Sequence, residues 1–340
     1  MQTRDWPVLT GLENRNVLVT GAGGFLGRHL LPQLLACGAN VTGLVRSPRA
    51  ALPEGVRQVL GDCRDEKAMR RLLQGQDVVI HLAGTLFGAS WQDYLAANSE
   101  AARNVAAGAR DASRIILVSS LAAAGPCAIE PGRNEAQNPE PVSAYGWSKL
   151  LAEQVMSALL GDRLVILRPP IIYGSGDRGL LPLFKSAKKG FGIGPARFPV
   201  SVIHAGDAAT ACALACQPEA AGIYHLGDGK SYQMDAICQA MARAQGRERL
   251  RMLRPPRALM RISAFLGSLA NGVGRGICAL AGKKAPPPPA WNPDKYREAI
   301  QPGWLADNSR ICRELGFKAT YSLEAGMAEA VAGYRNEGWL

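Results

Sequence analysis

Three side chains in this sequence stand at spacings that suit proton transfer. Tyr145 and Lys149 lie four positions apart, which places both on one face of a helix. A phenol of ordinary pKa, about 10, is a poor base at neutral pH, but a fixed ammonium beside it favours the phenolate. Ser120 follows the apolar run 115–119, so its hydroxyl would stand at the carboxyl end of a strand. We therefore predict Ser120, Tyr145 and Lys149 as catalytic residues that exchange a proton with a substrate.

A glycine-rich turn supplies a second kind of chemistry. Residues 21–27 read Gly-Ala-Gly-Gly-Phe-Leu-Gly and follow the apolar run 16–20. Gly21 and Gly24 would tighten the turn and let backbone N–H groups approach a pyrophosphate, and Gly27 would let the next helix pack on the strand. The N-terminus of that helix favours phosphate charge. At the first strand of an alternating strand–helix pattern, the turn predicts a dinucleotide site.

The end of the second expected strand, residues 40–45, bears on which nicotinamide cofactor is used. Val45 stands where NAD-binding Rossmann proteins usually carry the acid that holds the ribose diol, and Arg46 follows it. A guanidinium without that carboxylate suits a 2′-phosphate, so NADP is favoured over NAD. The alternative is that Arg46 is solvated or stacks on adenine. Asp62, after the third strand, either accepts from the adenine amino group or is a solvated loop acid.

Elements that would position these residues alternate through the first half of the chain. Expected strands cover residues 16–20, 40–45, 56–60, 77–82, 115–119 and 164–167, and expected helices cover 25–37, 91–112 and 144–160. This alternation predicts an α/β fold, a doubly wound parallel Rossmann sheet. We place the cofactor domain at residues 1–173, with returns to the sheet near 200–207 and 223–227. Residues 174–340 would form a smaller substrate-binding region.

Composition excludes several classes of protein. The chain has 340 residues, 47% hydrophobic and 20% charged, as in globular proteins. A net charge of +11 suits anionic partners such as a phosphorylated cofactor, but no Lys/Arg stripe interleaved with aromatics indicates nucleic acid. The eight cysteines form no CxxC pair, so we expect no metal site. Residues 1–14 do not resemble a signal peptide and no long apolar run is present, so we expect a cytoplasmic protein.

Motifs along nearly the whole chain resemble the extended short-chain dehydrogenase/reductase superfamily, of the NAD-dependent epimerase/dehydratase type. They are residues 20–27, 81–84, Asn98, 119–120, Tyr145 with Lys149, 167–169, 173–174, Asp207, and the segments 307–310, 315–317 and 338–340. The resemblance implies Ser120, Tyr145 and Lys149 as the catalytic triad. Asn98 would be structural or a proton-relay residue. The implied cofactor contacts are Gly21, Gly24, Phe25, Leu26, Gly27, Arg46, Asp62, Cys63, Leu82, Ala83, Gly84, Tyr145, Lys149 and Pro169.

Departures from the family's patterns point to one branch. Residues 121–124 are Leu-Ala-Ala-Ala, so the acids that dehydratases and decarboxylases of the superfamily place there are absent. Ile171 and Val200 stand where sugar-nucleotide epimerases usually bind their substrate's diphosphate, and apolar side chains there suit an apolar ligand. This texture is similar to the 3β-hydroxysteroid dehydrogenase and dihydroflavonol reductase branch. That likeness implies that residues 252–280 cover a hydrophobic substrate and contact a membrane surface; an ordinary packed helix is the alternative.

The leading hypothesis is an NAD(P)-dependent oxidoreductase that interconverts a secondary alcohol and a ketone on a bulky apolar molecule such as a 3β-hydroxysteroid. If the neighbouring carbon bore a carboxylate, the β-keto acid formed would lose CO2 without a further catalytic acid. One alternative is a sugar or sugar-nucleotide epimerase. Another is a non-catalytic scaffold that binds NADP(H). The resemblance also implies a homodimer formed through the Tyr145/Lys149 helix.

Overall fold

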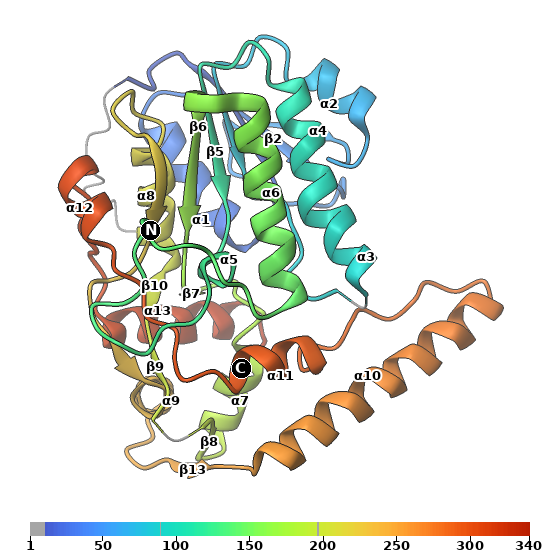
Figure 1. Ribbon diagram of the computed structural model, residues 1–340, viewed down its shortest axis with the longest axis vertical. Helices are drawn as coiled ribbons and strands as arrows, with labels where there is room; N and C mark the ends of the chain where they lie inside the picture. The colour runs from blue at the N-terminus through green and yellow to red at the C-terminus, as the bar shows by residue number, and fades with distance from the viewer. Residues whose placement is uncertain (1–10, 89, 196) are drawn as a thin grey trace.

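A parallel seven-stranded sheet forms the centre of the protein, as Figure 1 shows for the computed structural model. The structure describes residues 11–88, 90–195 and 197–340, so most of the segment 1–14 lies outside the described residues. The strand order is β11-β6-β5-β4-β1-β2-β3, and every neighbouring pair runs parallel. The strands are β1 (Asn16–Thr20), β2 (Asn40–Val45), β3 (Arg57–Leu60), β4 (Val78–His81), β5 (Arg114–Val118), β6 (Leu164–Arg168) and β11 (Gly222–His225). The chain order reverses between β1 and β4, which is where such sheets open a crevice for ligands.

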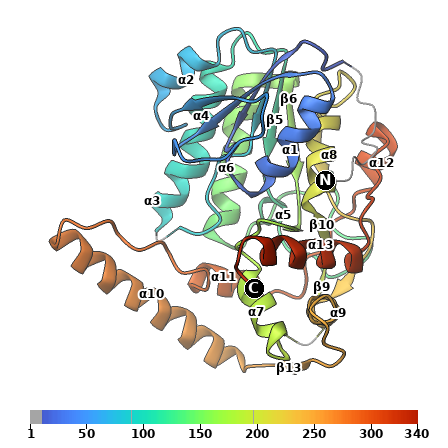
Figure 2. The same ribbon diagram turned by 180° about the vertical axis from the view of Figure 1, so that it is seen from behind.

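Helices cover both faces of this sheet (Figures 1 and 2). On one face lie α1 (Phe25–Ala36), α8 (Ala205–Leu214) and α12 (Ser309–Leu315), which share a buried core with the sheet. On the other lie α2 (Glu66–Leu72), α4 (Ala101–Gly108) and α6 (Ala144–Leu160), with a second core. Strands buried on both faces need continuous apolar runs, which is why they were readable from the sequence. The predicted doubly wound α/β fold is confirmed.

The second half of the chain builds a smaller layer below the carboxyl ends of the strands (Figure 1). Its core packs α7 (Leu181–Lys188), α9 (Met234–Arg243) and α13 (Leu323–Asn336) together. Three short strand pairs complete it: β7 (Ile171–Tyr173) with β10 (Val202–His204), β9 (Pro199–Val200) with β12 (Tyr232–Gln233), and β8 (Phe191–Ile193) with β13 (Arg251–Leu253).

One expected return to the large sheet is wrong. The strand near residues 200–207, β10, pairs with β7 in a separate two-stranded sheet. Pro169 and Pro170 separate β7 from β6, and neither can donate a ladder hydrogen bond, so the chain leaves the large sheet there. The strand near 223–227 does lie in the large sheet, as β11 beside β6. The division of the chain at residue 173 stays a prediction, because α8, β11 and α12 all pack with the first half.

Two further segments matter for the site. Residues 91–112, expected as one helix, form α3 (Trp91–Tyr94), the π-helix η1 (Leu95–Glu100) and α4. After β13 comes α10 (Arg257–Leu280), a long arm at the edge of the molecule that leads back to α11 (Pro293–Ala299) (Figure 1). The remaining short helices are α5 (Leu121–Ala124) and η2 (Gly161–Arg163). Among the described residues, no helix combines the length and the apolar character needed to cross a membrane.

Candidate active site

The glycine turn leaves space that side chains would fill. Gly21 has φ +69°, and a Cβ there would lie 2.9 Å from the backbone nitrogen of Ala83. A Cβ on Gly27 would lie 2.3 Å from the carbonyl oxygen of Ala22. Gly24 caps α1 without any side-chain hydrogen bond to the helix, so the first N–H groups of α1 keep their capacity to bind an anion. This cradle fits the pyrophosphate of a dinucleotide.

The adenosine end of the cradle holds an ion pair that the sequence analysis did not anticipate. Asp62 accepts hydrogen bonds from the Arg64 side chain, the shortest 2.6 Å, and from the Arg64 backbone nitrogen at 2.9 Å. The bond to Arg64 lowers the pKa of Asp62. Asp62 is therefore a partly exposed, ion-paired carboxylate, and its contact with the adenine amino group stays a prediction. Arg46 is exposed and lines the same cavity.

Of the three predicted catalytic residues, Ser120 lies between β5 and α5, and Tyr145 and Lys149 lie on α6. Ser120 begins α5, and its Oγ accepts from the backbone nitrogen of Ala122 at 3.1 Å. Tyr145 lies in the first turn of α6, and Lys149 one turn later donates to the carbonyl oxygen of Val118 at 2.7 Å. The side chains of all three line one cavity.

Burial governs the protonation of this group. It raises the pKa of Tyr145, which the hydrogen bond with Ser120 partly offsets. It also lowers the pKa of Lys149 to about 8, against the opposing effect of Glu153. In the protein without ligand the phenol is therefore neutral, and any charge that favours the phenolate has a large effect because the surroundings are poorly solvated.

Asn98, for which two roles were open, holds backbone and side chains in place. Its Oδ1 accepts from the Thr85 nitrogen at 2.8 Å, and its Nδ2 donates to the Ser148 Oγ at 2.8 Å. The π-turn of η1 carries it. Because both ends of the amide are bonded to neighbours, the contacts favour the structural role over a proton relay.

A cavity of about 1020 Å³ joins these parts. Gly27 is the one predicted site residue that does not line it; that glycine packs against Ala22 instead. The predicted residues on its wall are Gly21, Gly24, Phe25, Leu26, Arg46, Asp62, Cys63, Leu82, Ala83, Gly84, Ser120, Tyr145, Lys149 and Pro169. Ile171 also lines the cavity, whereas Val200 is buried in the core behind it. Cavity residues that sequence reasoning missed include Arg64, Phe87, Trp291, Lys295, Glu298 and Trp304.

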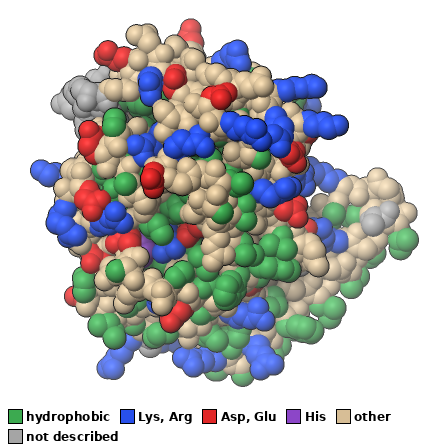
Figure 3. Space-filling view, turned by 45° about the horizontal axis from the view of Figure 1, so that its top comes forward, with side chains coloured by type: hydrophobic (Ala, Val, Ile, Leu, Met, Phe, Trp, Pro, Cys, Tyr) green, Lys and Arg blue, Asp and Glu red, His purple; other side chains and the backbone are tan. Residues whose placement is uncertain are grey.

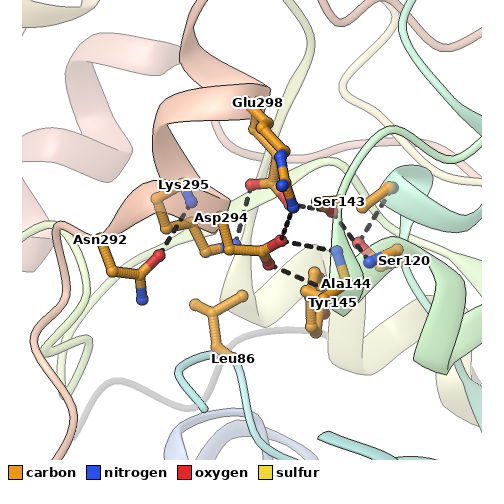
Figure 4. A network of polar contacts seen from close by, with 12 residues as sticks. Leu86, Ser120, Ser143, Ala144, Tyr145, Asn292, Asp294, Lys295 and Glu298 are labelled. Atoms are coloured by element: carbon orange, nitrogen blue, oxygen red, sulfur yellow. Dashed lines mark hydrogen bonds and ion pairs between the residues drawn. The ribbon is translucent and has the colours of Figure 1, made fainter. Parts of the chain in front are cut away.

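Lys295 and Glu298 lie on α11, which meets the N-terminus of α6 (Figure 4). Asp294 accepts from the backbone nitrogens of Ala144 and Tyr145 at 2.6 and 3.1 Å. Ser143 donates to Glu298 at 2.7 Å. A carboxylate at the first turn of a helix satisfies unpaired N–H groups and complements the helix dipole. Residues far along the chain thus fix the turn that carries Tyr145.

The family model described as "NAD dependent epimerase/dehydratase family" matches residues 17–227. This range contains the glycine turn, the predicted triad and the seven strands of the large sheet except Asn16, the first residue of β1. The chain belongs to this family. It is an NAD(P)-dependent enzyme of the extended short-chain dehydrogenase/reductase type.

Known relatives extend the match. This chain is 29% identical over 335 residues to a ceramide reductase of Caulobacter vibrioides, and the match covers 95% of this chain and 96% of the relative. It is 27% identical over 248 residues to a decarboxylating sterol-4-alpha-carboxylate 3-dehydrogenase of Dictyostelium discoideum, covering 64% and 73%. An epimerase structure from Methanothermobacter thermautotrophicus superposes with a TM-score of 0.76 at 18% identity, over 96% of this chain and 94% of that one. At this identity, the likeness to the epimerase structure shows only that the two folds are alike.

Proposed function

We propose that the protein interconverts a secondary alcohol and a ketone on a bulky hydrophobic substrate, with Ser120, Tyr145 and Lys149 as catalytic residues. The observation that carries this proposal is the wall of the cavity beyond Tyr145. It is built from apolar side chains, among them Leu86, Phe87, Leu121, Ile171, Ile172, Leu180, Phe198, Trp291 and Trp304. Such a wall binds an apolar body by burial, and it offers few partners for the hydroxyls of a sugar.

The chemistry follows from the positions of the three side chains. Bound NAD(P) would supply the hydride acceptor or donor. Tyr145 removes the hydroxyl proton of the alcohol as hydride leaves the same carbon, and it returns the proton in the reverse direction. Ser120 donates a hydrogen bond to the reacting oxygen. Lys149 stays protonated at neutral pH, since its pKa is about 8, and its ammonium favours the Tyr145 phenolate.

A 3β-hydroxysteroid is the substrate we favour among hydrophobic alcohols. Two relatives are named for a ceramide and a sterol carboxylate, both lipids. With a carboxylate on the neighbouring carbon, oxidation would give a β-keto acid. The bond to the carboxyl group then breaks, CO2 leaves, and the electron pair forms an enolate that takes a proton from water. No additional acid is required, which agrees with the alanines at 122–124.

NADP is the cofactor we favour. Arg46 and Arg64 both line the cavity near the end of β2 and β3, and the ends of these strands hold the adenosine ribose in Rossmann folds. Guanidinium groups there suit a 2′-phosphate. The relative affinities of the wild type for NADP+ and NAD+, measured by calorimetry and repeated with Arg46→Met, test this preference.

The experiment that tests the function follows the absorbance of reduced nicotinamide. NADP+ and NAD+ are each offered with 3β-hydroxysterols, with and without a 4-carboxylate. We expect substrate-dependent reduction that Tyr145→Phe abolishes. Cofactor binding without any net reduction would favour a sugar or sugar-nucleotide epimerase, to be tested with nucleotide sugars. Turnover in Tyr145→Phe equal to wild type would remove Tyr145 from the mechanism, and binding without any turnover would favour a scaffold.

We also propose that α10 lies on a membrane surface. Large hydrophobic residues recur every three or four positions along it, and each is more than half exposed: Leu259, Ile262, Leu266, Leu269, Val273, Ile277 and Leu280. Residues 249–293 contain eight Lys and Arg residues and no acid. Figure 3 shows hydrophobic side chains gathered on and beside this arm, with Lys and Arg nearby. An amphipathic basic helix of this kind suits the interface of an anionic bilayer.

Vesicle sedimentation tests this contact. Wild type should sediment with phosphatidylglycerol-rich vesicles and much less with phosphatidylcholine vesicles. Phe265→Asp with Leu269→Asp should abolish the difference, whereas Leu60→Asp, a similarly exposed leucine on β3, should not. Equal sedimentation of the α10 variant and the wild type would refute the contact. A homodimer through α6 is a separate proposal, tested by sedimentation velocity of the wild type and of Trp147→Glu.

A further inference from the structure

Lys295 stands beside the candidate catalytic tyrosine without belonging to the predicted triad. Its Nζ lies 4.5 Å from the centroid of the Tyr145 ring and 5.9 Å from that of Phe87. The side chain is 14% exposed and lines the cavity. Asn292 caps the helix that carries it, accepting from the Lys295 backbone nitrogen at 2.9 Å. Figure 4 shows Lys295 and Tyr145 in one network.

The other cationic side chains on the cavity wall lie away from the apolar part of the cavity or belong to the predicted triad. Among the described lining residues the lysines and arginines are Arg46, Arg64, Lys149 and Lys295. The two arginines follow β2 and β3, at the adenosine end. Lys149 donates to Val118 from the helix that carries Tyr145. Lys295 is therefore the cation left for the substrate itself, within walls that are otherwise largely apolar.

The ion pair with Glu298 holds the Lys295 ammonium in place but does not use all of its hydrogen-bond donors. Glu298 Oε2 accepts from Lys295 at 2.8 Å, and Oε1 accepts from Ser143 at 2.7 Å. Glu298 is thus fixed through both oxygens. An ammonium has three N–H donors, and this ion pair uses one. Burying a lysine costs free energy unless it is paired, and here the pairing is already made before any ligand binds.

We propose that Lys295 is an anion subsite that binds a carboxylate of the substrate close to the reacting carbon. The inference rests on the proposed function, because the reacting oxygen must contact Tyr145 and Ser120. It narrows the substrate to a hydrophobic β-hydroxy or β-oxo acid, in which the carboxyl group sits on the carbon next to the alcohol or ketone. A singly charged carboxylate fits better than a phosphate, because one lysine flanked by Glu298 cannot neutralise two charges.

Binding of non-reacting ligand pairs tests the subsite. In the NADPH-bound enzyme an alcohol cannot be oxidised, so affinities can be measured by calorimetry without turnover. The probes are 3-hydroxypalmitate with its methyl ester, and a 4-carboxy-3β-hydroxysterol with its methyl ester. We expect at least one acid to bind about tenfold more tightly than its ester, the value of one charged hydrogen bond.

Variants assign the preference to Lys295. Lys295→Met should bring acid and ester to within about twofold of each other, with the ester affinity unchanged, and Lys295→Arg should keep most of the preference. Glu298→Gln should increase it, because the competing charge is gone and an oxygen remains for Ser143. Arg297→Met removes an exposed cation of the same helix and should change nothing.

Acids that bind no better than their esters would overturn the subsite, as would a preference that survives in Lys295→Met. Neither result bears on hydride transfer. If the wild type oxidises esters or unsubstituted sterols as well as acids, the proposed function stands and the subsite is wrong. If acids bind through Lys295 but nothing is oxidised, the proposed function is wrong and the subsite stands.

Discussion

Lys149→Met should make the ligand-free protein more stable at neutral pH while removing its activity. Burial lowers the pKa of Lys149 from 10.5 to about 8. A shift of this size corresponds to about 3–4 kcal/mol at ~1.4 kcal/mol per pKa unit, and it is the cost of keeping the ammonium charged in the folded state. The variant also leaves the Val118 carbonyl without its donor, which costs about 1–2 kcal/mol. A net gain of about 1–3 kcal/mol remains.

The pH dependence of this gain has a definite sign. Below about pH 8 the lysine is protonated in both states and the wild type bears the full cost. Between about 8 and 10.5 the native state binds fewer protons than the unfolded state, so wild-type stability rises relative to the variant. Urea unfolding at neutral pH and at about pH 10 measures the difference, with the exposed Lys188→Met as control. A variant that is less stable than wild type at neutral pH, by a margin constant with pH, would refute the reasoning.

Three further predictions concern the frame of the site. Gly27→Ala should cost about 1–3 kcal/mol of stability and most of the NADP+ affinity, because its Cβ would lie 2.3 Å from the Ala22 oxygen; thermal unfolding and calorimetry measure both, and wild-type affinity would contradict it. Arg168→Met should destabilise by about 3–5 kcal/mol by leaving Glu153 buried and unpaired, since both side chains are at most 4% exposed; the double variant Arg168→Met/Glu153→Met should recover most of this in urea unfolding, and no recovery would exclude the charge as the cause. Asp294→Ala should lower stability by about 0.5–2 kcal/mol, because α6 loses a capping carboxylate. It should also reduce kcat while changing KM less, and an unchanged kcat would mean that α11 does not position Tyr145.

The parts of the fold that the sequence predicted are those with local causes. Strands buried on both faces are apolar runs, and α6 was predicted with its observed bounds, 144–160. In the structure Ser143 caps this helix and Gly161 follows its end, so its limits have local causes. The glycine turn was readable because its steric demands, at Gly21 and Gly27, arise within one strand–turn–helix unit. The predicted site residues, apart from Gly27, lie on one cavity, since strand ends of a parallel sheet share an edge.

What sequence reasoning missed depends on contacts between distant segments. The π-turn of η1 interrupts the helix expected at residues 91–112, and it places Asn98 between Thr85 and Ser148. The spacing of apolar residues does not indicate these hydrogen bonds, so it could not predict the π-turn. Lys295 sits in a segment whose sequence shows only a helix start, Asn292 followed by a proline. Nothing local indicates that this helix ends up against Tyr145, 150 positions earlier.

The contact between α11 and α6 has a consequence for the order in which the protein is made. A ribosome releases the strands of the large sheet, the glycine turn and the whole of α6 well before it reaches Asp294 and Glu298. Until then the first turn of α6 lacks the acceptors for its Ala144 and Tyr145 N–H groups. In a nascent chain the turn that carries Tyr145 therefore gains this carboxylate only after residue 294 has been added. A chain that ended near residue 290 would lack this carboxylate, and it would also lack α12, which packs in the core beside the large sheet.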